Sequence, residues 1–536
     1  MAIIESSINT GSESFAANAE WMSEKVKEFQ AIEQLVVDTA GKKREALAKL
    51  DKLLPRERLH CLLDPGAPFI ELSSLVGYKM YDDKDGSSAG GGFIAGIGYV
   101  SGVRCLVQVN NYSVKGGTFS PIGLEKTIRA QKIALENKLP IINLLESGGA
   151  NLNYATESFV RGANGFANQA RLSAAGIPQI TVVHGNATAG GAYQAGLSDY
   201  MILVRNKSKI FLAGPPLLKA ATGEIADDEE LGGADMHAAV AGTGEYLAEN
   251  DADGIRIARE VVGTLNWEPL PKSQKSFKEP LYNPDELMGI VPSDPKTPYD
   301  VKELIARIAD GSDFMEFKPG FDQGTVCGHC RIQGQPVGVI GNNGPITPKG
   351  ANKASQFIQL CEQSNTALLF LHNTTGFLVG TETEQNGVVK HGSKMIQAVA
   401  NAQVPKISLV VGGSYGAGNY AMCGRGLDPH FIFAWPSART AIMGGEQAGM
   451  VLRIVAEEKA RKAGVEPDKQ QLEQMEQSTA DFLNQSATAL FGTARLWDDG
   501  LIDPRDSRQL LGFLLDICRE GEQRQIRSIT FGAARF

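Results

Sequence analysis

The chain has 536 residues and a net charge of −9, with 43% hydrophobic and 21% charged residues. This is the composition of a globular protein with a sizeable core, and the acidic balance without a long Lys/Arg run argues against a nucleic-acid surface. No stretch of about 18 uncharged apolar residues occurs, and the N-terminal segment lacks the basic and apolar regions of a secretory signal. The seven scattered cysteines do not resemble a disulfide framework. We therefore expect a cytoplasmic protein that binds neither nucleic acid nor a membrane.

Helical and strand-like segments alternate along most of the chain. Residues 16–64 have the amphipathic spacing of helices, and from about residue 92 short apolar runs alternate with longer helical ones. The strand-like runs are FIAGIGYV (93–100), CLVQVN (105–110), IINLLES (141–147), QITVVHG (179–185) and YMILV (200–204), with a helix expected over 122–138. Such alternation predicts an α/β fold with βαβ crossovers.

The same order of segments returns after a stretch rich in Pro, Lys and Asp at 265–300, which is typical of an interdomain linker. The later strand-like runs are VGVIGN (337–342), TALLFLHN (366–373), ISLVVGG (407–413) and FIFAWP (431–436), with helices expected over 355–365 and 389–403. We therefore predict two domains, 1–275 and 276–536.

The two domains align with each other as an internal duplication. Residues 139–150 correspond to 366–377, each a buried strand followed by a loop of small residues. Residues 177–193 correspond to 404–420, each a proline, an apolar strand and a loop with Ala-Gly that leads into a helix containing tyrosine.

The loops TAGGAY and YGAGNY carry the predicted chemistry. A strand that ends in such a loop and opens a helix presents backbone N–H groups, and glycine or alanine lets a carbonyl oxygen approach them. This is how an oxyanion hole is built. A phosphate-binding turn, or simply a tight strand-to-helix turn, remains open for either loop alone. Two equivalent loops in duplicated domains favour two oxyanion sites.

Taken together, these loops and the segments ESGGANL (146–152), IFLAGPPLLKAATGE (210–224), ELGGADMH (230–237) and FAWPSARTAIMGGEQA (433–448) resemble the carboxyltransferase β subunits of biotin-dependent acyl-CoA carboxylases. Within that family, ESGGANL and YGAGNYAMCGR are most similar to the methylcrotonyl-CoA and geranyl-CoA branch. The resemblance implies an α/β architecture of two duplicated crotonase-like domains. It also implies transfer of CO2 from carboxybiotin to an α,β-unsaturated acyl-CoA.

The resemblance implies specific roles for residues of both halves. Gly190 and Gly191 would hold the thioester oxygen, and Ala417 and Gly418 the ureido oxygen of biotin, whose freed nitrogen would act as the base. The expected coenzyme A contacts and acyl pocket comprise Lys115, Gly116, Gly117, Gly148, Gly149, Gly165, Phe166, Ala167 and Lys219. Small residues at 165 and 167 favour geranyl-CoA, with 3-methylcrotonyl-CoA as the alternative.

Other features set the expected partners and the rival functions. No Ala-Met-Lys-Met biotinylation site or ATP-binding loop occurs, so we expect a separate α subunit with biotin carboxylase and biotin carrier functions. The family also implies a homo-hexameric core without metal. Cys327-Gly-His-Cys330 is predicted to lie in a β-hairpin rather than in a redox or zinc site. His184 is either a packed histidine or a functional one. A biotin-independent crotonase hydratase or isomerase and a non-catalytic scaffold are the other hypotheses.

Overall fold

A computed structural model gives the fold and describes residues 2–149, 151–267 and 276–533. The chain divides into two compact units. The N-unit comprises Ala31–Lys272, Ala494–Leu496 and Arg519–Phe536, and the C-unit comprises Met1–Gln30, Ser273–Thr493 and Trp497–Cys518. The predicted boundary between residues 275 and 276 adjoins the segment 268–275, which lies outside the described residues, and it stays a prediction.

The N-unit contains an eight-stranded mixed sheet in the order β2-β3-β4-β5-β6-β7-β9, with β8 also paired to β6. The strands are β2 (Ile70–Leu72), β3 (Phe93–Val100), β4 (Val103–Asn110), β5 (Ile141–Ser147), β6 (Gln179–Thr188), β7 (Tyr200–Val204), β8 (Lys209–Phe211) and β9 (Tyr246–Ala248). β2, β3 and β4 pair antiparallel, and the remaining pairs are parallel. Parallel pairing brings the carboxyl ends of β5 and β6 to one edge of the sheet.

The N-unit also contains α-helices. They are α1 (Glu13–Gly41), which begins in the C-unit, α2 (Arg44–Lys49), α3 (Pro55–Leu62), α4 (Pro121–Glu136), α5 (Ala155–Ala174), α6 (Gly190–Gly196), α7 (Pro215–Thr222), α8 (Asp228–Gly232) and α9 (Asp251–Thr264). The main core forms where α3 and α9 pack against the central strands, with residues such as Leu62, Val107 and Ile180 fully or almost fully buried.

The C-unit repeats this topology. Its eight-stranded sheet has the order β1-β10-β11-β12-β13-β14-β15, and β16 also pairs with β14. The strands are β1 (Ala2–Ile3), β10 (Asp313–Glu316), β11 (Thr325–Ile332), β12 (Gln335–Asn342), β13 (Ala367–Thr374), β14 (Lys406–Tyr415), β15 (Phe431–Ala434) and β16 (Arg439–Ala441). β13, β14, β15 and β16 pair in parallel, as their counterparts in the N-unit do.

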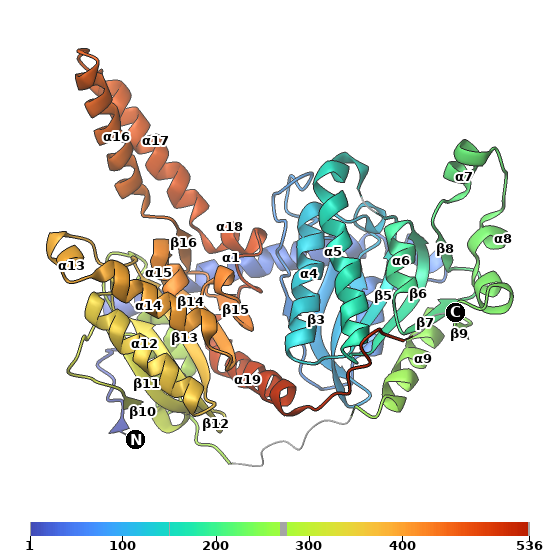
Figure 1. Ribbon diagram of the computed structural model, residues 1–536, viewed down its shortest axis with the longest axis horizontal. Coiled ribbons are helices and arrows are strands. Elements are labelled where there is room, and N and C mark those ends of the chain that lie inside the picture. The colour runs from blue at the N-terminus through green and yellow to red at the C-terminus, as the bar shows by residue number, and fades with distance from the viewer. Residues whose placement is uncertain (1, 150, 268–275, 534–536) are drawn as a thin grey trace. The chain divides into compact units, whose positions relative to one another are not determined.

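The C-unit helices include a long hairpin that stands out from the rest of the unit, α16 packed against α17 (Figure 1). The helices are α10 (Leu287–Ile290), α11 (Lys302–Ile308), α12 (Pro348–Gln363), α13 (Thr381–Gln385), α14 (Val388–Asn401), α15 (Gly416–Ala421), α16 (Gly445–Lys462), α17 (Lys469–Ser486), α18 (Ala489–Ala494) and α19 (Ser507–Gln523). α12 and α14 pack on each other over a core that includes Phe357 and Phe370.

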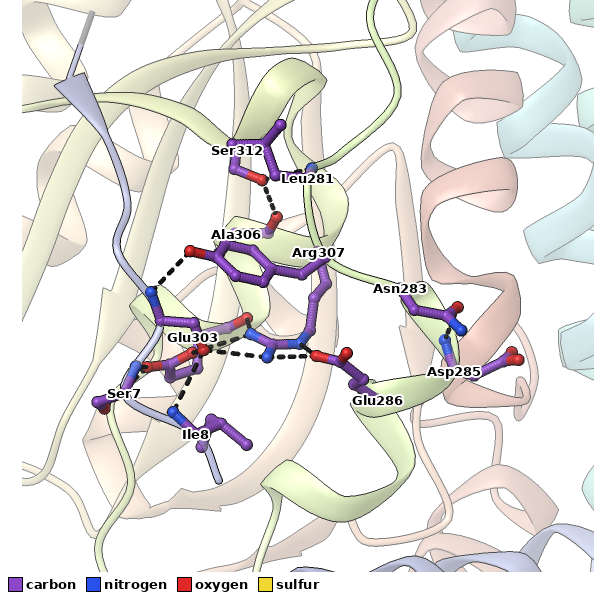
Figure 2. A network of polar contacts seen from close by, with 12 residues as sticks. Ser7, Ile8, Leu281, Asn283, Asp285, Glu286, Glu303, Ala306, Arg307 and Ser312 are labelled. Atoms are coloured by element: carbon purple, nitrogen blue, oxygen red, sulfur yellow. Dashed lines mark hydrogen bonds and ion pairs between the residues drawn. The ribbon is translucent and has the colours of Figure 1, made fainter. Parts of the chain in front are cut away.

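A buried polar network explains why the first residues of the chain belong to the C-unit. Arg307 is 1% exposed and pairs with Glu303 at 2.9 Å and with Glu286 at 2.6 Å. The same Glu303 carboxylate accepts hydrogen bonds from the Ser7 N–H at 2.7 Å and from the Ser6 hydroxyl at 2.6 Å. Figure 2 shows that the segment after β1, which carries Ser7 and Ile8, lies beside this cluster. The charged pair thus fixes a segment almost 300 residues distant in sequence.

The predicted strands and the central helices are confirmed, three of the strands to the residue (93–100, 141–147 and 200–204). The predicted helical stretch 16–64 is instead three helices. Its last break falls at Leu54, whose extended backbone (ψ 154°) precedes Pro55 at the start of α3. Proline disfavours helical geometry in the residue before it and begins helices well.

Candidate functional site

In the N-unit, a strained turn joins β6 to α6. Ala189 has φ +52°, its N–H donates to the Phe211 carbonyl at 3.1 Å, and its carbonyl accepts from the Ala192 N–H at 3.1 Å. Gly190 and Gly191 are the first two residues of α6 and precede its first hydrogen-bonded N–H. Because the first N–H groups of a helix have no intrahelical partner, this turn presents donors to a ligand oxygen.

Packing within the unit does not require glycine at these two positions. A Cβ built on Gly190 would lie 3.5 Å from Phe166 Cζ, and one on Gly191 would lie 3.4 Å from Ser147 Cβ. Both separations are ordinary van der Waals contacts, and neither residue has a positive φ. Packing alone therefore does not explain the two glycines, whereas close approach of a ligand atom to the backbone would.

The other predicted glycine loops lie against this turn. The Gly148 N–H donates to the Gly116 carbonyl at 3.1 Å, and the Gly149 N–H donates to Ser147 Oγ at 3.1 Å. Ser147 Oγ in turn donates to the Gly117 carbonyl at 3.1 Å. The end of β5 thus brings residues 116–117 and 148–149 next to the start of α6.

The two predicted phosphate-binding lysines have different surroundings. Lys115 Nζ lies 3.3 Å from Asp82 Oδ2, and both side chains are exposed. The Tyr154 hydroxyl donates to the same carboxylate at 2.8 Å, and these two partners hold the pKa of Asp82 below its usual value. Lys219 is exposed on α7, which follows β8. Contact of either lysine with coenzyme A stays a prediction.

The predicted acyl pocket maps to α5. The Phe166 ring meets the Tyr193 ring edge-on, with centroids 6.0 Å apart, and Phe166 is the side chain nearest Gly190. A Cβ on Gly165 would meet no atom of the described residues within 4 Å. Ala167, two positions on, is half-buried. Open space therefore lies beside Gly165, next to the residue that contacts the turn.

The C-unit builds an equivalent turn between β14 and α15. Gly416 has φ +52°, the same value as Ala189, and Ala417 and Gly418 follow as the second and third residues of α15. The Gly376 N–H donates to Thr374 Oγ1 at 3.2 Å, as Gly149 does to Ser147. A Cβ on Gly418 would lie 2.8 Å from Gly376 Cα, so here glycine is required for close packing.

These correspondences follow a constant sequence offset of 227 positions, which joins Ser147 to Thr374 and Ala189 to Gly416. The neighbouring strands are in the same register, since Ser147 pairs with Ala187 and Thr374 with Ser414. Sequence reasoning missed the two hydroxyl residues and Gly376. All three lie within the aligned segments 139–150 and 366–377, so comparing the two segments position by position would have identified them.

A cavity of about 450 Å³ opens beside the C-unit turn. It is lined by Val410, Gly416, Ala417, Asn419, Tyr420, Arg425, Ile432, Ala434, Ala438, Thr440, Ala441, Ile442, Ala489, Gly492, Trp497 and Asp498. The wall is mainly apolar, and Ala417, at the turn, is exposed. The cavity was not foreseen, because residues 489–498 are distant in sequence from the loop they adjoin.

His184 is a packed histidine. It is fully buried, and its Nδ1 lies 2.9 Å from Asp251 Oδ1. Arg58 also pairs with that carboxylate at 2.9 Å and with Glu146 at 2.7 Å. Burial and the nearby Arg58 lower the pKa of His184. Glu146 directly precedes Ser147, so this ionic cluster supports the strand end that carries the site.

The Cys327–Cys330 segment is the predicted β-hairpin, formed by β11 and β12. Both thiols are free and buried, and burial raises the pKa of Cys330 to about 12. Neither thiol therefore ionises near neutral pH, which argues against redox or metal chemistry.

Across 2–149, 151–267 and 276–533, no three or more His, Cys, Asp or Glu side chains are grouped as metal ligands would be. In that same part of the chain, no helix combines the length and apolar character needed to cross a membrane.

Each of the two duplicated α/β units has a turn at the start of a helix, which is the arrangement expected of an enzyme that stabilises oxyanions. The chain belongs to the carboxyl transferase domain family, whose model matches residues 48–527. It is a carboxyltransferase of the biotin-dependent acyl-CoA carboxylase type with crotonase-like units, as the sequence resemblance predicted.

Known relatives support the assignment. The crystal structure of the P. aeruginosa geranyl-CoA carboxylase β subunit matches with 65% identity, a TM-score of 0.94 and 100% of both chains covered. The Mycobacterium tuberculosis biotin-dependent 3-methylcrotonyl-coenzyme A carboxylase β1 subunit is 47% identical, over 89% of this chain and 90% of its own. The Dictyostelium discoideum mitochondrial methylcrotonoyl-CoA carboxylase β chain is 43% identical, over 96% and 88%.

Proposed function

We propose that this chain transfers CO2 from carboxybiotin to the γ carbon of an α,β-unsaturated acyl-CoA, and that the acyl group is geranyl. The proposal is supported by the 65% identity to a geranyl-CoA carboxylase β subunit. The observation that carries the choice of substrate is the open space at Gly165, beside Phe166. A larger side chain at this position would occupy the volume that a longer acyl chain needs.

In the proposed reaction, the N-unit binds the acyl-CoA. The N–H groups of Gly190 and Gly191 donate to the thioester oxygen as negative charge develops on it. Preorganised donors stabilise this charge without reorganisation, and each is worth about 10²–10³ in rate. The loops 116–117 and 148–149 contact the coenzyme A portion, and Lys115 and Lys219 its phosphates.

The C-unit binds the biotin ureido ring in this scheme. When bound, carboxybiotin supplies CO2 and, after its release, a ring nitrogen that accepts the substrate proton. The N–H groups of Ala417 and Gly418 donate to the ureido oxygen. The positive φ at Gly416 supports this role, because it turns the chain so that α15 begins directly at the end of β14.

The proposal includes a partner and an assembly. Biotin is carried by a separate α subunit with biotin carboxylase and carrier functions, and no metal is needed in this chain.

We expect a homo-hexameric core, supported by exposed apolar residues on the α16–α17 hairpin such as Met450, Ile454 and Phe482. Light scattering that found a fully active monomer would contradict the hexamer. The seven free cysteines fit a reducing compartment, the cytoplasm.

Reconstitution tests the function and the substrate together. The chain is combined with a biotinylated α subunit, ATP and labelled bicarbonate, and incorporation into geranyl-CoA and 3-methylcrotonyl-CoA is measured. We expect partner-dependent carboxylation with geranyl-CoA preferred. Rejection of geranyl-CoA by an active enzyme would assign it to methylcrotonyl-CoA. Hydration or isomerisation of an enoyl-CoA without the partner would instead support a biotin-independent crotonase.

A further inference from the structure

The cavity beside the C-unit turn contains a buried acid that the proposed reaction does not yet use. Asp498 lines the cavity together with Ala417 and is 5% exposed. It follows Trp497, which also lines the cavity, and the surrounding wall is largely aliphatic. A carboxyl group is costly to bury among such side chains unless it gains hydrogen bonds.

Two charged residues, Arg425 and Asp499, lie near Asp498. Arg425 Nη2 pairs with Asp499 Oδ1 at 2.7 Å, and the Ile432 N–H donates to the other Asp499 oxygen at 2.9 Å. Asp499 is therefore part of the frame of the unit. Asp498 Oδ1 accepts from the Gly500 N–H at 3.0 Å. Arg425 lines the cavity too and favours the charged form of Asp498, but it forms an ion pair with Asp499, so Asp498 remains part of the cavity wall.

We propose that Asp498 recognises the ureido ring in this cavity by accepting a hydrogen bond from a ring N–H, while Ala417 and Gly418 donate to the ring oxygen. The inference rests on the proposed function. A cyclic urea has a carbonyl acceptor and N–H donors on adjacent atoms, so a site for it needs both N–H groups and an acceptor. The cavity supplies both, with apolar walls for the remainder of the bicyclic ring. Asp498 is a positioning residue in this scheme.

The proposal makes recognition depend on pH. Burial, and to a smaller extent the nearby Asp499, raise the pKa of Asp498 to about 7, although Thr493, Arg425 and the Gly500 N–H act to lower it. Above pH 7 the carboxylate is a charged acceptor, and below pH 7 the group is a neutral acid. Charged acceptors form hydrogen bonds about twice as strong as neutral ones. Turnover limited by the biotin half-reaction should therefore fall as the pH drops below 7.

The test uses the complete reconstituted enzyme with Asp498→Asn. We expect a tenfold or greater loss of carboxylation at pH 8, loss of the acidic limb of the pH profile, and an acyl-CoA Kd within twofold of wild type. Asp506→Asn is the control, because Asp506 belongs to the same unit, also has a raised pKa, and does not line the cavity. Asp498→Glu should retain the acidic limb. Wild-type rate and pH profile in Asp498→Asn would overturn the inference.

A second measurement needs no variant and guards against misfolding. Biotin methyl ester should inhibit the wild-type enzyme at least tenfold better at pH 8 than its analogue methylated on the ureido nitrogen, and the difference should shrink at pH 6. Equal inhibition at both pH values would overturn the inference. If wild-type enzyme with its biotinylated partner carboxylated no acyl-CoA, the proposed function itself would fail, which is a distinct outcome.

Discussion

The two units support the same loop geometry in different ways. Glu146 at the end of β5 and Asn373 at the end of β13 occupy equivalent positions, and each lies against a glycine of the next strand. A Cβ on Gly185 would lie 2.5 Å from Glu146 Oε1, and one on Gly412 would lie 2.5 Å from Asn373 Oδ1. The backbone arrangement has thus been kept while the side-chain chemistry behind it has changed.

In the N-unit this position is part of a closed ionic cluster. Glu146 pairs with Lys52 at 2.6 Å and with Arg58 at 2.7 Å, and the Arg58 and Glu146 side chains are each 1% exposed. Arg58 continues to Asp251, which is bonded to His184. The cluster ties α3, β5, β6 and α9 together, so the strand ends below Gly190 are fixed by strong, mutually dependent contacts.

In the C-unit, Asn373 instead faces a second cavity, of about 360 Å³. Tyr299, Thr374, Gly412 and Tyr415 line it as well. Within the described residues, the buried Tyr299 hydroxyl has no hydrogen-bond partner. The same turn geometry is therefore compatible with an ionic cluster behind it or with a neutral side chain beside a cavity, and the two supports should respond differently to mutation.

Arg58→Met, which removes the ionic support of the N-unit, should change stability most. The change leaves Glu146 and Asp251 without their shared buried cation, and removing one partner of such a pair costs about 3–5 kcal/mol. Urea denaturation followed by a signal from the N-unit should show this loss. Arg256→Met is the control, since Arg256 belongs to the same unit and pairs with Asp253 and Glu260 at the surface, where ion pairs contribute little. Equal losses of unfolding free energy in the two variants would show that the buried cluster stabilises the N-unit no more than a surface ion pair does.

The strands and the duplication could be predicted because they depend on patterns within short stretches of sequence. Strands 93–100, 141–147 and 200–204 are continuous apolar runs bounded by turns, and the duplication was visible because both copies keep proline, strand and small-residue loop in order. The supports behind the loops were not predictable in the same way. Arg58 lies 88 positions from Glu146 and 193 from Asp251, and no local pattern links them.

The ion pair of Lys115 likewise could not be predicted from the sequence. The glycine-rich segment made Lys115 a candidate for binding phosphate, but its ion pair with Asp82 depends on folding across 33 positions. The cavity lined by Asp498 was missed for the same reason. Residues that the two units share at the 227-residue offset could be predicted by aligning the two halves. Contacts that occur in only one unit could be found only from the three-dimensional structure.

The next prediction tests whether the acyl-CoA and the biotin ureido ring bind to different units. Ala417→Val places a branched side chain at the exposed mouth of the C-unit cavity, where it should block the ureido ring from the N–H donors. We expect turnover to fall about 10²–10³-fold, the effect of losing an oxyanion donor. Calorimetry should find acyl-CoA affinity almost unchanged.

Gly190→Val is the matched control for Ala417→Val, because it alters the equivalent position of the N-unit. It should weaken acyl-CoA binding. A loss of acyl-CoA affinity in Ala417→Val as large as its loss of turnover would show that the functions of the two units are not separate.

A smaller effect should distinguish substrates. Gly165→Phe fills the open space on α5, and each buried CH2 of an acyl chain contributes about 0.8 kcal/mol. Turnover of geranyl-CoA should fall at least tenfold more than that of 3-methylcrotonyl-CoA in parallel assays. Ala163→Phe, at an exposed position of the same helix, serves as the control and should change neither. Equal losses on both substrates would remove the argument for a geranyl pocket.

The smallest effect tests whether Lys115 serves the N-unit by binding coenzyme A phosphates. Asp82→Asn removes the carboxylate that now holds Lys115 at 3.3 Å. Exposed ion pairs are weak, so freeing the lysine should lower the KM for acyl-CoA by at most about fivefold. Lys115→Met should raise the KM, and the double variant should match Lys115→Met, because Asp82 would then have no lysine to restrain. The kcat and the acyl-chain preference should stay constant in all three. A KM that does not change in either single variant would assign the lysine to the surface ion pair alone and leave coenzyme A binding to the backbone of the glycine loops.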